Sequence, residues 1–182
     1  MGLGISAIQN ILELYNLGYL KNSNSVLDIG SQELHCTKND VKILFEQAGL
    51  DSKIVDKYPN VDNWPNKPRC SAKYFYNSLG LESYNCIDIN DQFNSINHDL
   101  NLPYNDNSRF NKYDVVTDYG SCEHVFNISE CYKTVHNLTK PGGFIIIAQG
   151  TYKGNGYFLF DKSFFDGIAA ANNYKVIYSS YI

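Results

Sequence analysis

The sequence predicts an α/β fold, in which a mostly parallel central sheet carries helices on both faces. Short apolar runs of strand type alternate along the chain with segments whose apolar residues recur at helical spacing. The strand-type runs are apolar almost throughout, which is typical of strands that are covered on both sides. The 182 residues suit one domain, and we expect residues 1–182 to form it.

In the first half of the chain, residues 1–20 hold a helix because Ile5, Ile8 and Ile11 recur at helical spacing. The next helix has Asp40 as its expected N-cap, and a third helix is stopped by Gly80. Apolar runs that end in polar residues predict the strands. The expected helices are residues 5–14, 40–48 and 71–79, and the expected strands are 25–30 and 84–89.

Residues of about 51–70 separate these elements as an insertion rich in proline and asparagine. The segment contains Pro59, Pro65, Pro68 and the only tryptophan, Trp64, and no apolar periodicity runs through it. We therefore expect a loop or lid, and irregular loops of this length are often functional.

The second half continues the alternation of strands and helices. An apolar run leads into Asp118, and a Pro-Gly-Gly turn at 141–143 precedes the next strand. The expected strands are residues 113–118, 144–149 and 174–182, and the expected helices are 129–138 and 163–172.

Composition excludes several classes of function. The chain has 15 basic and 19 acidic residues, a net charge of −4 and no basic block, which argues against nucleic acid as a partner. No apolar run reaches the roughly 18–20 residues of a membrane helix, so no membrane partner is expected. The N-terminal segment lacks a basic region and contains Glu13, so we interpret it as a packed helix and not a signal peptide.

The five cysteines form no C-x-x-C pair. An odd number of cysteines without metal-site spacing, in a chain without an export signal, predicts reduced thiols and a cytoplasmic location. We expect each to be a small buried apolar residue, and we expect no metal site.

The expected strands end in residues that suit ligand binding, and in parallel sheets ligands bind at the carboxyl ends of the strands. After the first strand, Gly30 allows a tight turn and Asp28 orients that turn or reaches a cationic ligand. An ordinary strand-to-helix turn is the alternative. After the second strand, the Asp88 carboxylate can accept both hydroxyls of a ribose, with a solvated aspartate as the alternative. Further on, Asp99 and the Leu100 backbone N–H can bind adenine, or Asp99 only forms a turn.

The strand over 113–118 leads into Glu123 and His124. These side chains can serve as an acid–base pair, or bind a divalent metal together with Asp118. Three candidate ligands so close in sequence rarely complete a metal site, so we favour an orienting role for Glu123.

Taken together, these segments resemble class I S-adenosylmethionine-dependent methyltransferases over residues 22–150. SVLDIGSQE resembles the first motif of the family, NCIDIN the second, HDLNLPY the third, YDVVTDYGSCEHVF the fourth and LTKPGGFIII the turn before the fifth strand. Gln32 and Leu34 stand where the family usually has Gly-x-Gly spacing. The distance from Asp28 to Asp88 is also larger than in a simple nucleotide-binding unit, because of the insertion.

The resemblance implies a Rossmann-like methyltransferase fold with S-adenosylmethionine as the cofactor. His124 is the expected catalytic base, oriented by Glu123, and Trp64 with the aromatic segment 152–160 is expected either to shape the acceptor pocket or simply to pack in the core. The acceptor is expected to be a small molecule or glycan-like. The residues expected to bind the cofactor are Asp28, Gly30, Ser31, Asp88, Asp99, Leu100 and Tyr119.

The family has seven strands, and this sequence ends at Ile182 inside the sixth. A trimmed fold and a fragment of a longer chain are both consistent with this, and the methylated atom and oligomeric state stay open. A non-catalytic adenosine-cofactor-binding or scaffold protein is the main alternative function. A dinucleotide-dependent oxidoreductase is disfavoured, because G-x-G-x-x-G is missing after the first strand.

Overall fold

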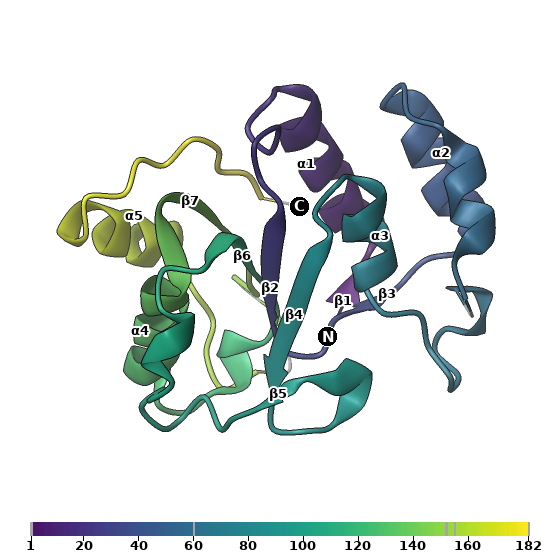
Figure 1. The fold of residues 1–182 in the computed structure, drawn as a ribbon. Coiled ribbons are helices and arrows are strands. Elements are labelled where there is room, and N and C mark those ends of the chain that lie inside the picture. The colour runs from purple at the N-terminus through teal and green to yellow at the C-terminus, as the bar shows by residue number, and fades with distance from the viewer. Residues whose placement is uncertain (1, 60, 152, 155, 182) are drawn as a thin grey trace.

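A computed structural model describes residues 2–59, 61–151, 153–154 and 156–181. The chain has an α/β fold around a five-stranded sheet with the order β5-β4-β2-β6-β7, and every neighbouring pair in it is parallel (Figure 1). This confirms the predicted α/β class and the parallel sheet. The strands are β2 (Ser25–Ile29), β4 (Ser83–Asp88), β5 (Ile96–Asn97), β6 (Tyr113–Tyr119) and β7 (Thr139–Ala148).

The order of the strands places a topological switch point between β2 and β6. Counted along the chain, the five strands lie across the sheet in the order third, second, first, fourth and fifth. This is the Rossmann-like order, in which the chain leaves the first strand in both directions and opens a crevice at the strands' carboxyl ends. Ile29 is in register with Ile87 on one side and Asp118 on the other, so these three strands end at one level.

Two apolar cores, one on each face of the sheet, hold the first four helices. Alternation along β2 sends Val26 into the core shared with the first three helices, and Leu27 into the core shared with α4. The helices are α1 (Ile5–Asn16), α2 (Lys38–Gln47), α3 (Lys73–Ser78), α4 (Ile128–Leu138) and α5 (Lys162–Ala171).

The N-terminus of α2 differs from the prediction. Thr37, not Asp40, is the N-cap: the Thr37 side chain accepts a hydrogen bond from the Asp40 N–H, and the Asp40 carboxylate accepts one from the Thr37 N–H at 2.8 Å. Asp40 is thus the third residue of a capping box, a reciprocal pair that the sequence also allows.

The insertion is packed, although the sequence predicts a loop. It contains two 3₁₀ helices, η1 (Ser52–Lys57) and η2 (Val61–Asn63), and it buries Val55, Tyr58 and Val61 in the core beside α2. A second unpredicted feature is the parallel pair β1 (Gly2–Leu3) and β3 (Glu33–Leu34), whose two-residue length leaves no periodic signal. The remaining 3₁₀ turns are η3 (Gln92–Asn94), η4 (Asn107–Arg109) and η5 (Cys122–His124).

The end of the chain departs most from prediction. β7 is one strand over Thr139–Ala148, so the residues 141–143, expected to form a turn before the strand, lie within it. The strand starts early because Thr139 already pairs with Tyr113, and the register shifts after that pair. The expected last strand is absent from the described residues 174–181, and Ile182 lies outside them. This tail instead crosses toward α1 (Figure 1), where Ile177 and Leu14 line a small cavity.

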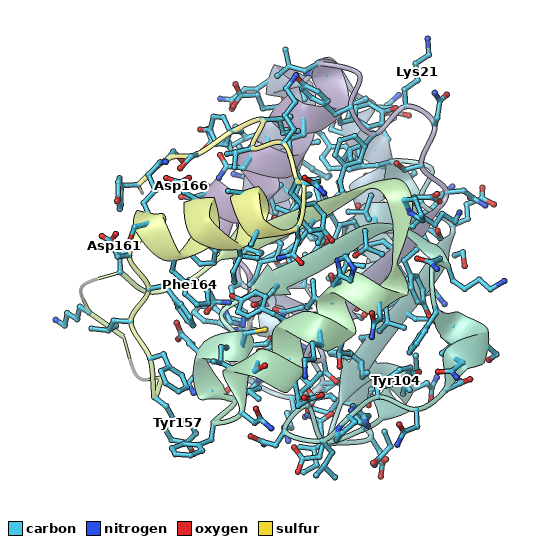
Figure 2. The ribbon with its side chains drawn as sticks, turned by 90° about the vertical axis from the view of Figure 1, so that its left-hand side faces the viewer. Lys21, Tyr104, Tyr157, Asp161, Phe164 and Asp166 are labelled. Atoms are coloured by element: carbon cyan, nitrogen blue, oxygen red, sulfur yellow. The ribbon has the colours of Figure 1, made fainter. Side chains whose placement is uncertain are left out.

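A hollow of about 1580 Å³ lies between β7, α5 and the tail. Asp161 is the N-cap of α5, and its side chain accepts a hydrogen bond from the Ser163 N–H at 2.9 Å. The helix crosses in front of β7 in Figure 2. α5 has no buried residue, although its apolar residues recur at helical spacing. The outer edge of β7 therefore faces a cavity and not a further strand in the described chain.

Among the described residues, no helix has the length and apolar character needed to cross a membrane.

Candidate functional site

The structure brings Gly30, Ser31 and Asp88 together at the carboxyl ends of β2 and β4. Gly30 turns the chain with a φ of +85°, a region that favours glycine, and its N–H donates to the Ile87 carbonyl at 2.8 Å. The Ser31 N–H then donates to Asp88 Oδ2 at 2.7 Å. Asp88 therefore holds the first loop against the second strand.

A neighbouring loop covers this junction. Asp88 is 8% exposed, and its Oδ1 accepts the Asn90 N–H at 3.3 Å. The Ser31 hydroxyl donates to Asn90 Oδ1 at 3.0 Å and lies 3.2 Å from the Gln92 carbonyl. Each carboxylate oxygen of Asp88 has one protein donor and keeps capacity for a second, which is what two ribose hydroxyls require.

Asp99 and Leu100, the residues expected to bind adenine, come directly after a backbone contact with Asp88. The His98 N–H donates to the Asp88 carbonyl at 3.0 Å, which brings the following residues alongside. Asp99 Oδ1 accepts the Asn101 N–H and side-chain amide at 2.9 and 2.8 Å, and these bonds lower the pKa of Asp99. Leu100 is buried in the core.

Asp28 lies apart from this junction. Its carboxyl group is fully buried and bonds to side chains of both strands that flank β2: it accepts a hydrogen bond from the Tyr84 hydroxyl at 2.8 Å and one from the Thr117 hydroxyl. Desolvation raises the pKa of Asp28 to about 7, and the hydroxyl donors offset only part of it. The structure thus places Asp28 in the core beneath the sheet, not in the loop that it was expected to orient.

Gln32 bridges the ends of β2 and β6. Its side chain is fully buried, and Nε2 donates to the Ile29 carbonyl at 2.7 Å and to the Ser121 hydroxyl at 2.9 Å. Gln32 Oε1 is buried without a partner among the described residues. The amide therefore spans the switch point and stands where the resembling motif has glycine.

Asp118, the third candidate metal ligand, accepts hydrogen bonds from backbone N–H groups. Its Oδ1 accepts the N–H groups of Ser121 and Cys122 at 2.9 and 3.2 Å, and Oδ2 accepts the Gln149 amide. Burial raises the pKa of Asp118 to about 6. The described residues contain no group of three or more His, Cys, Asp or Glu residues placed to hold a metal ion.

Glu123 and His124 are neighbours, but Glu123 makes its shortest contact elsewhere. His124 Nε2 lies 3.5 Å from Glu123 Oε1, whereas Glu123 Oε2 accepts the Gly150 N–H at 3.0 Å. The Glu123 carbonyl also accepts the Tyr157 N–H at 2.7 Å. Glu123 lines the large hollow and fixes the segment after β7, and the hollow's wall does not include His124.

Trp64 and the aromatic segment 152–160, expected either to shape an acceptor pocket or to pack in the core, lie in different surroundings. Phe160 is buried against Tyr132, Phe164 and Phe165, which bears out core packing for it. Tyr152 lies outside the described residues. Trp64 packs on the His35 ring, with centroids 4.8 Å apart.

His35 is the residue that the sequence analysis missed. It lines the hollow together with Tyr119, which was expected beside the methyl donor, and its Nε2 lies 2.9 Å from Glu33 Oε1. The signal was present: Glu33 and His35 are two residues apart just after the first-strand loop, and this spacing puts both on one face of an extended chain.

The chain was compared with protein-family models, with curated proteins and with solved structures, and none of the three gives a match.

Proposed function

We propose that this protein binds S-adenosylmethionine and transfers its methyl group to a small-molecule or glycan-like acceptor. The observation that carries the proposal is the hydrogen bond from the Ser31 N–H to Asp88 Oδ2, beside the switch point of a Rossmann-like sheet. Such crevices at the carboxyl ends of strands are where α/β sheets of this order bind nucleotide-type ligands.

The residues present suit the ribose and adenine of the cofactor, whereas its amino-acid end meets a side chain that already occupies the space. Asp88 offers acceptor lone pairs at the end of the second strand, and Asp99 and Leu100 lie beside it, which suits the ribose and adenine. Gln32 occupies the space that the amino-acid end would take. Binding of the whole cofactor therefore requires the Gln32 side chain to leave the crevice.

The bound cofactor would supply an activated methyl group, and the protein would supply alignment and proton removal. Tyr119 and Glu123 both line the hollow, so an acceptor there lies next to the ends of β6 and β7. The proposal includes a cytoplasmic location, which the five free, buried cysteines support.

Isothermal titration calorimetry with S-adenosylmethionine and S-adenosylhomocysteine tests the proposal. We expect micromolar binding by the wild type and at least tenfold weaker binding by Asp88→Ala. Asp91→Ala, which removes an exposed carboxylate three residues away, is the matched control and should bind as the wild type does. Circular dichroism shows whether each variant is folded. A folded wild type that binds neither ligand contradicts the proposal.

A non-catalytic adenosine-cofactor-binding or scaffold protein is the second candidate, and the buried Gln32 favours it. The two functions differ in turnover. A methyltransferase releases S-adenosylhomocysteine when given a panel of alcohols, phenols, amines and sugars, whereas the second candidate binds the cofactor and releases none.

A further inference from the structure

His35 lines the hollow, and its ring lies between Trp64 and the backbone of Gly2. It follows β3, directly after the loop that carries Ser31 and Gln32. The ring packs on Trp64 at an interplanar angle of 31°, and its side chain is 25% exposed. Any side chain at position 2 would collide with this ring, so Gly2 lets β1 pass close beside it.

A buried carboxylate fixes the orientation of the ring. Glu33, with a side chain only 4% exposed, accepts the Arg69 Nη1 hydrogen bond at 2.5 Å on the same Oε1 that contacts His35 Nε2. Arg69 is itself held by the Pro65 carbonyl at 3.1 Å. Because a carboxylate only accepts hydrogen bonds, this contact selects the tautomer that carries its proton on Nε2.

The other ring nitrogen is left as an acceptor. His35 Nδ1 has no hydrogen-bond partner among the described residues, and the ring borders the hollow that Tyr119 also lines. The Tyr119 hydroxyl is itself buried without a partner in the described chain. Burial lowers the pKa of His35, and Glu33 opposes this effect, so the imidazole is neutral at neutral pH.

We propose that His35 is the proton-accepting group for the acceptor molecule and that Glu33 is the residue that positions it. This inference rests on the proposed methyl transfer. The arrangement, a base whose second nitrogen is oriented by a buried carboxylate, recurs in enzymes that activate weak nucleophiles.

An O–H or N–H bond of the acceptor breaks, and the proton goes to His35 Nδ1. The electron pair of the acceptor atom forms the new bond to the methyl carbon, while the pair of the broken carbon–sulfur bond stays on sulfur. The imidazolium formed is stabilised by the Glu33 carboxylate until it loses its proton to water.

His35 suits this role better than His124, the base expected from sequence. His124 lies 3.5 Å from a carboxylate whose other oxygen already accepts the Gly150 N–H, and it is not part of the hollow's wall. His35 has a 2.9 Å contact to its carboxylate and borders the hollow.

The test uses the charge of the two ligands and needs no knowledge of the acceptor. S-adenosylmethionine carries a positive sulfonium, and S-adenosylhomocysteine has a neutral sulfur in its place. A base that faces this sulfur binds its proton about tenfold more weakly in the first complex than in the second, as a unit charge at a distance of several ångströms requires. We would follow the imidazole signals of ¹⁵N-histidine-labelled protein by NMR through a pH titration of both saturated complexes.

The other histidines serve as internal controls, and His35→Gln assigns the signal. The inference requires the Nε2–H tautomer in the wild type, a change in its population in Glu33→Gln, and a difference between the two complexes at His35 but not at His98 or His136. Equal titration midpoints for His35 in two saturated complexes overturn the inference and leave the proposed function intact. Absence of binding in calorimetry overturns both.

Discussion

Burial raises the pKa of two carboxyl groups, that of Asp28 to about 7 and that of Asp118 to about 6. The sequence places Asp28 at the end of a strand but does not show which face it occupies. Strand alternation sends it to the core, toward Tyr84 and Thr117, which lie 56 and 89 residues further along the chain. Partners that distant leave no local pattern, so the role of the residue was not predictable from its motif.

The buried Asp28 should make stability depend on pH. The unfolded chain loses this proton near pH 3.8, whereas the folded protein keeps it up to about pH 7. The folded state therefore binds more protons in this window, and the free energy of unfolding falls as pH rises through it. Asp28→Asn has no carboxyl group to ionise, so its free energy of unfolding should not decrease in this way. At pH 8 its free energy of unfolding should exceed that of the wild type by on the order of 2–4 kcal/mol.

Urea unfolding followed by circular dichroism at pH 4.5 and pH 8 measures the effect. Asp91→Asn changes an exposed carboxyl group and should follow the wild type at both values. An Asp28→Asn variant that is less stable than the wild type at pH 8 would show that the ionised carboxylate stabilises the fold, which contradicts a raised pKa.

Gln32 makes a second prediction at this scale. Gln32→Ala removes the amide that spans Ile29 and Ser121, and so opens the crevice. We expect the variant to bind S-adenosylhomocysteine about tenfold more tightly, because no binding energy is spent on displacing the side chain. Gln92→Ala, at an exposed position of the neighbouring loop, is the control. Calorimetric affinities that are equal for the wild type and Gln32→Ala would contradict this account.

Among the elements, those with long apolar runs or clear helical spacing were predicted within a few residues. The failures have separate causes. β1 and β3 are too short for any period, and the tail 174–181 has strand-type residues but no neighbouring strand to pair with in the described chain. The insertion packs through Val55 and Val61, which are isolated in sequence and meet only in the fold.

The capping box of α2 gives a prediction for a single element. Thr37→Ala removes the side-chain acceptor for the Asp40 N–H, so we expect a loss of about 1 kcal/mol in the free energy of unfolding. Asn39→Ala, an exposed change in the same turn, should stay within about 0.5 kcal/mol of the wild type. Equal stability of Thr37→Ala and Asn39→Ala by urea unfolding would refute the cap.

At the scale of the whole molecule, the parallel sheet with helices on both faces follows from the alternation of strands and helices, whereas the order of the strands is known only from the structure. The site contacts do not follow from this alternation either, because Glu33, His35 and Arg69 meet through the insertion, and Gln32 closes the crevice from a position where the motif predicts glycine. The motifs therefore predict a site at the ends of these strands, and the fold determines which side chains lie there.

Stability should be uneven across the molecule. α5 buries no residue and the tail has no strand partner among the described residues, whereas β2 is buried throughout. Hydrogen exchange followed by mass spectrometry should therefore show amides of α5 and 174–181 exchanging at least a hundredfold faster than those of β2 and β6. Equal protection would mean that the hollow beside β7 is filled in solution.

The proposed cofactor site is the crevice at the ends of β2, β4 and β6. Its most direct test is the map of backbone amide NMR signals that change when S-adenosylhomocysteine is added to the ¹⁵N-labelled protein. The account predicts the largest changes at Gly30, Ser31, Asp88 and Tyr119. Changes confined to β7 and the tail, or no change at millimolar ligand, would contradict it.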